Sequence, residues 1–108
     1  MFNTVADIFE QYNKTLKDLV PNHPVKGPIQ YNIIGEGGGD WYLEIDGVNI
    51  IAHQGTIAEP VSIVECETQA YIDLKNGKVS HNEILADKRM KLIKGIRNIL
   101  ILSTFMVK

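Results

Sequence analysis

Three short segments in which apolar and polar residues alternate place the strongest constraint on how this chain can fold. They are Ile29–Ile34, Trp41–Asp46 and Val48–Gln54, and alternation of this kind is typical of strands with one buried face. The sequence Glu-Gly-Gly-Gly-Asp at 36–40 separates the first two segments, and Asp46-Gly47 separates the second from the third. Glycine-rich and Asp-Gly sequences favour tight hairpin turns, because glycine adopts positive φ without strain. The sequence therefore predicts an antiparallel meander of three strands.

The segments on either side of the meander predict helices and two further strands. Thr4 is a suitable N-cap, and apolar residues recur after it at helical spacing, which predicts an N-terminal helix within residues 1–20. The segment Val61–Glu67 predicts a fourth strand. Its inward face is ambiguous, because the apolar residues at 61 and 63 suit one register and those at 64 and 66 suit the other. The remaining predicted elements are short helices over Thr68–Leu74 and Asn82–Asp87 within residues 68–88, a last strand over Met90–Lys94 and a final helix over Ile96–Met106.

Together these elements predict a single α+β domain over residues 1–108. Residues 29–67 supply a four-strand sheet, and the strand at 90–94 completes it. We therefore expect a five-stranded, mainly antiparallel sheet with helices packed on one face. No repeat, low-complexity tract or linker divides the chain, and a chain of this length buries roughly two thirds of its unfolded surface.

Composition and charge narrow the classes of function. The net charge is −2 and no dense basic cluster is present, so we expect no nucleic-acid partner, because such proteins carry a cationic stripe. The first residues lack the basic start and apolar core of a signal peptide. The longest apolar run, Ile99–Leu102, is far shorter than the roughly 20 residues of a membrane span. Cys66 is the single cysteine and cannot form an internal disulfide, which favours a cytoplasmic location.

The predicted C-terminal helix is apolar on nearly every side. Its residues 99–102 are Ile-Leu-Ile-Leu, which covers a full turn, and Phe105 and Met106 follow. A helix on the surface of a protein normally has one apolar stripe and one polar face. The sheet can cover one side of this helix, and the other side needs a second helix, a partner chain or a bound apolar ligand. The helix is therefore either simple core or one wall of a binding site.

Four stretches of the sequence, in their order and spacing, resemble a known family. They are Ile33–Trp41 with its glycine turn, Gly55 with Pro60–Ile63, Tyr71–Lys78, and Lys91–Gly95 followed by the apolar tail. Together they are similar to the sterol carrier protein type-two family, over the part of the chain from about Ile29 to the end. Two positions depart from the family pattern near the last helix: Asp87-Lys88-Arg89 replaces a usual glycine, and Ile96 replaces a usual polar residue.

This resemblance implies a sheet and flanking helices that enclose a hydrophobic tunnel. It implies binding of a lipid such as a fatty acid, a fatty acyl-CoA or a sterol-like molecule, without catalysis, cofactor or metal. Transfer of that lipid between membranes is left open. The final helix would then act as a lid over the tunnel. The residues expected to contact the ligand are Tyr71, Leu74, Ile84, Leu85, Leu92, Ile96, Ile99, Leu100, Ser103, Phe105 and Met106. The alternative hypothesis is a structural or interaction domain, whose apolar helix is buried in a homodimer or on an enzyme partner.

Other residue groups favour structural roles over chemistry. The glycines at 37–39 lack the Gly-Lys-Ser/Thr and the helix of a phosphate loop, and a hairpin turn explains them. Cys66 could pair with His53 or His81 as nucleophile and base, but its acidic neighbours Glu65 and Glu67 would raise the thiol pKa, so we expect a buried structural cysteine. Trp41 is expected to be core, where it packs the sheet against a helix.

Metal binding is not expected, and the basic residues leave two possibilities open. His23, His53 and His81 do not have the His-x-x-x-His spacing of a helical metal site. The C-terminal third is loosely basic, which is most simply a solvated face. The same residues could instead form a rim that meets a CoA phosphate or an anionic lipid head. They are Lys78, Lys88, Arg89, Lys91, Lys94 and Arg97.

Overall fold

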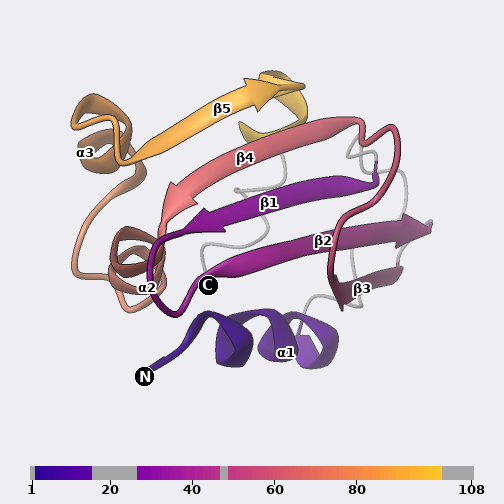
Figure 1. The fold of residues 1–108 in the computed structure, drawn as a ribbon, viewed down its shortest axis with the longest axis horizontal. Helices are drawn as coiled ribbons and strands as arrows, with labels where there is room; N and C mark the ends of the chain where they lie inside the picture. Colours follow the sequence, from indigo (N-terminus) through magenta and orange to yellow (C-terminus); the bar gives the residue numbers. More distant parts are fainter. Residues whose placement is uncertain (1, 16–26, 47–48, 101–108) are drawn as a thin grey trace.

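In the computed structural model, which describes residues 2–15, 27–46 and 49–100, the chain forms one five-stranded sheet with helices against one face (Figure 1). Helix α1 lies beside the β2–β3 end of the sheet, and α3 lies beside β5 at the opposite end (Figure 1). The elements are α1 (Val5–Thr15), β1 (Ile29–Ile34), β2 (Gly39–Asp46), β3 (Asn49–Gln54), β4 (Ser62–Glu67), α2 (Thr68–Lys75), α3 (His81–Ala86) and β5 (Met90–Lys94).

The strand order is β3-β2-β1-β4-β5, so the first strand of the chain lies at the centre of the sheet. The predicted meander is confirmed, because β1 pairs antiparallel with β2, and β2 pairs antiparallel with β3. The chain then crosses from β3 at one edge to place β4 beside β1, and this central pair is parallel. The β4–β5 pair is antiparallel. The sheet is therefore mixed, with a mainly antiparallel arrangement as expected.

Helix α1 begins at the predicted N-cap. The Thr4 hydroxyl oxygen accepts a hydrogen bond from the Asp7 backbone N–H at 3.1 Å, which satisfies one of the free N–H groups of the first turn. The buried face of the helix includes Phe9, whose ring stacks on Trp41 at a centroid distance of 5.0 Å and on Tyr71 at 5.7 Å. Trp41 is only partly buried, but it packs against the core and joins the sheet to the helix layer. Residues 16–20 of the predicted helix lie outside the described residues.

The glycine-rich turn between β1 and β2 is a hairpin, as predicted. The Gly38 N–H donates to the Gly35 carbonyl at 3.1 Å, and a Cβ on Gly38 would overlap the Ile33 carbonyl oxygen. The hydroxyl of Thr68, the first residue of α2, donates to the Ile34 carbonyl at 2.9 Å. The turn is therefore filled by the protein's own backbone and closed against α2, which leaves no cradle for a phosphate.

A buried glutamine on the outer face of the sheet fastens the connection between β3 and β4. The Gln30 side-chain amide donates to the Trp41 and Gly55 carbonyls at 3.1 and 3.2 Å. Its oxygen accepts from the Ile57 N–H at 3.0 Å. Both ends of the amide are satisfied, so its burial carries little desolvation penalty. This contact holds the crossing segment on the sheet and so helps to set the parallel pairing of β4 with β1.

Candidate functional site

A pocket that is partly open to solvent lies between the inner face of the sheet and the helices near β5. The lining comes from β1, β4, β5, α2, α3 and the start of the C-terminal helix. The lining residues are Tyr31, Val64, Tyr71, Leu74, Lys75, His81, Leu85, Met90, Leu92, Ile99 and Leu100.

The sheet side of the pocket depends on which face of β4 points inward. Ser62, Val64 and Cys66 are buried, whereas Val61 is exposed, so the register left open by the sequence is the one with 64 and 66 inward. Val64 pairs with Leu92 of β5, and Cys66 pairs with Met90. These cross-strand pairs give the pocket an apolar floor.

The helix side of the pocket is held by a capping box at the start of α3. The Ser80 hydroxyl accepts from the Glu83 N–H at 3.1 Å, and the Glu83 carboxylate accepts from the Ser80 N–H at 3.3 Å. This pattern fixes where a helix begins, and here it orients a helix of only six residues. His81 and Leu85 lie four positions apart on this helix and therefore face the same side. Both line the pocket.

The start of the C-terminal helix forms the solvent-facing edge of the pocket, here called its lip. The chain is helical from Ile96 to residue 100, the last residue described. The buried Ser62 hydroxyl donates to the Gly95 carbonyl at 3.1 Å and accepts from the Asn98 side-chain amide at 3.0 Å. Gly95 has a φ of +63°, and a Cβ there would overlap Ser62. Ile99 is 8% exposed whereas Leu100 is 49% exposed, so one pocket-lining residue is core and the next borders solvent.

Two basic side chains lie in this otherwise largely apolar lining, Lys75 and His81. The Lys75 ammonium nitrogen lies 5.4 Å from the centroid of the Tyr71 ring, a cation–π distance. Burial lowers the pKa of Lys75 to about 8, and the nearby Cys66 opposes this shift. Burial, followed by the adjacent positive charge of Lys75, lowers the pKa of His81. Burial is the largest cause of both pKa shifts, because it disfavours the charged form of each group.

Six of the residues expected to contact a ligand are brought together in this pocket: Tyr71, Leu74, Leu85, Leu92, Ile99 and Leu100. Ile84 is instead fully buried in the core and does not line the pocket. Ile96 is 50% exposed and does not line the pocket. Ser103, Phe105 and Met106 lie outside the described residues. A ligand-contact role for the six remains a prediction.

Sequence reasoning missed five lining residues. Three of them, Tyr31, Val64 and Met90, occupy inward positions of strands, and the alternation of apolar residues could have identified them. The other two, Lys75 and His81, carry no such signal. A lysine in the last turn of a helix and a histidine after a serine cap are common surface residues. Only the packing of α2 against β1 and β4, and of α3 against β5, places them in the pocket.

Cys66 is buried, and desolvation, followed by the charge of Glu67, raises the pKa of its thiol to about 12, which makes it a poor nucleophile. His53 hydrogen-bonds to Glu44 at 3.1 Å between the exposed faces of β2 and β3. Within the described parts of the chain, no group of three His, Cys, Asp or Glu residues is placed to hold a metal ion. Nor is any described helix long and apolar enough to cross a membrane.

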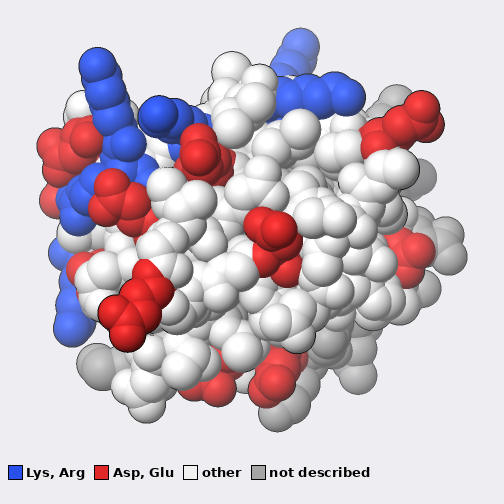
Figure 2. Space-filling model, in the orientation of Figure 1, with Lys and Arg blue, Asp and Glu red and all other residues white. Residues whose placement is uncertain are grey.

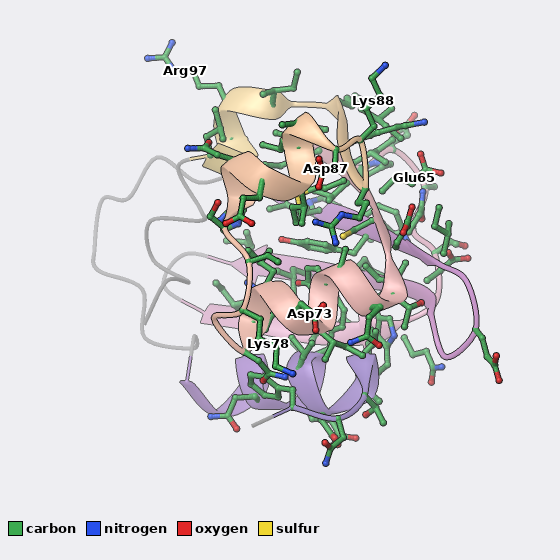
Figure 3. The ribbon with its side chains drawn as sticks, turned by 90° about the vertical axis from the view of Figure 1, so that its left-hand side faces the viewer. Glu65, Asp73, Lys78, Asp87, Lys88 and Arg97 are labelled. Atoms are coloured by element: carbon green, nitrogen blue, oxygen red, sulfur yellow. The ribbon has the colours of Figure 1, made fainter. Side chains whose placement is uncertain are left out.

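The basic residues cluster along the β5 end of the molecule. Figure 2 shows Lys and Arg side chains mainly at its upper edge, over α3 and β5. Lys88 and Arg97 project from this end, whereas Lys78 lies at the other end beside α1 (Figure 3). Arg89 pairs with Asp87 at 3.0 Å. The edge therefore borders the strand and helix that wall the pocket, and its role as a solvated face or a rim remains open.

Comparison with known proteins shows the fold. No protein-family model matches the sequence, and no curated protein matches it. Among solved structures, palmitated sterol carrier protein 2-like 2 from Aedes aegypti has a TM-score of 0.78 at 20% identity, covering 96% of this chain and 95% of its own. Sterol carrier protein 2 from Aedes aegypti in complex with palmitate has a TM-score of 0.73 at 17% identity, covering 98% and 96%. This chain has the sterol carrier protein 2 fold.

The same fold also forms part of a larger enzyme. The sec-alkylsulfatase Pisa1 from Pseudomonas sp. has a TM-score of 0.72 at 13% identity, over 92% of this chain but only 15% of that one. The fold therefore occurs both as a protein of this size and as a minor part of a long chain.

Proposed function

We propose that this protein binds a lipid with a long apolar chain in the pocket between the sheet and the C-terminal helix, and that it catalyses no reaction. The observation that carries the proposal is the pocket itself. Its walls are aliphatic and aromatic side chains, and its lip includes Leu100, a large apolar residue that is half exposed. Large apolar side chains that stay partly exposed beside a cavity are typical of ligand sites. Two structures with the same fold contain palmitate, which supports the same class of ligand here.

The expected affinity follows from the buried chain length. Each methylene group transferred from water contributes about 0.8 kcal/mol, so the fourteen methylenes of palmitate contribute about 11 kcal/mol if all are buried. Loss of translational and conformational freedom offsets several kcal/mol of this amount. A micromolar dissociation constant corresponds to about 8 kcal/mol and is within reach. Fatty acids, fatty acyl-CoAs and sterol-like molecules all carry enough apolar surface to qualify.

The proposal is tested by binding and by the state of the purified protein. We expect a fluorescent fatty acid to bind and to be displaced by palmitate, and native mass spectrometry to show lipid bound to the protein at a ratio of one to one. If no fatty acid, acyl-CoA or sterol binds at tens of micromolar, the pocket is a packing defect and the proposal fails.

A second candidate function is that of an interaction domain. The exposed apolar residues Ile93, Ile96 and Leu100 belong to β5 and the helix that follows it, and the fold recurs within a long alkylsulfatase chain. These residues could be covered by a second copy of this chain or by an enzyme partner. Light scattering with and without palmitate separates the two functions, because a constitutive dimer that binds no lipid would favour this second one.

A further inference from the structure

We propose that the Tyr31 hydroxyl, at the floor of the pocket, forms a hydrogen bond with a hydroxyl group on the buried chain of the ligand, so that the site prefers a hydroxylated fatty acid to the plain acid of the same length. This inference rests on the proposed function, since it assigns the chemical class of the lipid that the pocket takes. It is carried by a buried polar group that lines the pocket and has no hydrogen-bond partner among the described residues.

The depth of Tyr31 in the pocket is the first argument. Tyr31 belongs to β1, the central strand of the sheet (Figure 1), and it pairs with Val64 of β4, which also lines the pocket. It is 4% exposed, whereas Leu100 at the lip is 49% exposed. A ligand that reaches Tyr31 therefore does so with a part of its chain that has left water.

The hydroxyl of Tyr31 is the second argument. The ring meets Phe9 edge-on at a centroid distance of 5.4 Å and lies 6.0 Å from the Tyr71 ring. A phenylalanine could make both of these ring contacts, so the packing makes no use of the hydroxyl. The hydroxyl can donate one hydrogen bond and accept others, yet none joins it to any part of the chain that the structure describes. Buried hydroxyl groups are nearly always bonded, and the pocket is where a partner for this one can be supplied.

An uncharged oxygen is the ligand group that suits this position. Burial raises the pKa of Tyr31 far above neutrality, so its hydroxyl keeps the proton and can donate it in a hydrogen bond. An ionised head group keeps more of its hydration at the lip, where Leu100 borders solvent. A hydroxyl farther along the chain can both accept from Tyr31 and donate to it. A plain methylene chain at the same place would exclude water and leave the Tyr31 hydroxyl unbonded, which weakens binding.

Hydration of the pocket is the competing explanation, which the test must separate. The pocket is partly open, and a water molecule can satisfy a buried hydroxyl as well as a ligand can. In that case the hydroxyl of Tyr31 would have no influence on which lipid is preferred. Hydration therefore predicts that plain and hydroxylated chains keep the same ratio of affinities when the hydroxyl is removed.

The experiment compares stearate with a series of hydroxystearates that carry the hydroxyl at every second carbon, so that one of them brings its oxygen close to Tyr31 whatever the depth of insertion. Tyr31→Phe removes the hydroxyl and keeps the ring. The control is Tyr42→Phe, which removes the hydroxyl of a tyrosine that pairs with Gln30 on the outer face of the sheet and does not line the pocket. Dissociation constants come from displacement of a fluorescent fatty acid, and thermal midpoints are measured without ligand.

We expect at least one hydroxystearate to bind the wild type roughly tenfold more tightly than stearate does, because it satisfies a hydroxyl that the plain chain leaves unbonded. Tyr31→Phe should lose this preference and bind stearate at least as tightly as the wild type does. Without ligand, Tyr31→Phe should be no less stable than the wild type, because the hydroxyl that it lacks had no partner in the protein. Tyr42→Phe should keep the wild-type order of affinities.

The outcomes separate the two proposals. If no hydroxystearate binds the wild type more tightly than stearate, or if Tyr31→Phe keeps the preference, the role of Tyr31 is refuted while the lipid pocket stands. An equal loss of affinity for every lipid in Tyr31→Phe also refutes it, because the hydroxyl would then contact the acid group that all of them share. If stearate and all the hydroxystearates fail to bind the wild type, the proposed function itself fails.

The stability of Tyr31→Phe tests the premise directly. A clearly lower thermal midpoint, or a variant that does not fold, would mean that the hydroxyl is bonded within the protein, and this result contradicts the inference. The series on the wild type needs no variant, so the predicted preference for a hydroxylated chain is decided in either case.

Discussion

Replacing Leu100 by aspartate should weaken lipid binding far more than it weakens the fold. Leu100 lines the pocket, yet it is 49% exposed. Burying a whole leucine contributes about 1.5–3 kcal/mol, so a half-exposed leucine contributes about 1 kcal/mol to folding. The aspartate can keep its hydration when no ligand is present. With an acyl chain against it, the carboxylate loses part of that hydration, and we expect affinity for palmitate to fall at least roughly tenfold, which corresponds to about 1.4 kcal/mol.

The chain offers a matched control one helical turn earlier. Ile96 is 50% exposed, lies four positions before Leu100 on the same helix and does not line the pocket. Ile96→Asp places the same charge at the same exposure, and there it is favoured by the helix N-terminus. We expect it to leave palmitate affinity within about twofold. Dissociation constants from fluorescence displacement and thermal midpoints are measured for both variants. If the two lose equal affinity, or if Leu100→Asp loses none, this helix does not form the lip of a binding site.

Three further predictions follow from the same packing. Cys66→Ser should retain palmitate binding. It should lower the free energy of unfolding, measured by denaturant titration, by about 1–3 kcal/mol, because it buries a hydroxyl group. A loss of binding in a variant that is still folded would restore a direct role for the thiol. Amide hydrogen exchange at residues 96–100 should slow when palmitate is added, since ligand and helix stabilise each other; exchange there as slow as in β4 without palmitate would mean that the helix is plain core. Finally, if the β5 edge meets phosphate groups, the double variant Lys91→Glu with Lys94→Glu should bind palmitoyl-CoA more weakly at low salt and bind palmitate with unchanged affinity. An equal change for both ligands would mean that the edge is only a solvated face.

The sequence by itself determined the local elements, because their signals are periodic or depend on single residues. Alternation of apolar residues located β1, β2 and β3, and β5 has the predicted bounds Met90–Lys94. The cap at Thr4 and the hairpin at the glycine turn are formed by hydrogen bonds between residues only three apart. Motif order along the chain also indicated the fold that comparison with solved structures shows. Apart from the motif order, each of these features requires only residues near one another in sequence.

Tertiary structure alone decided which elements meet. The apolar residues at 61, 63, 64 and 66 allowed either face of β4 to point inward, and the parallel pairing with β1 selected the face with Val64. That pairing depends on a segment held across the sheet by Gln30, whose partners Gly55 and Ile57 lie 25 and 27 residues away. Lys75 and His81 enter one pocket because α2 packs on β1 and β4, and α3 packs on β5, which is the neighbour of β4. A side chain's environment depends on residues remote in sequence, so the cation in the pocket became visible only when the chain was folded.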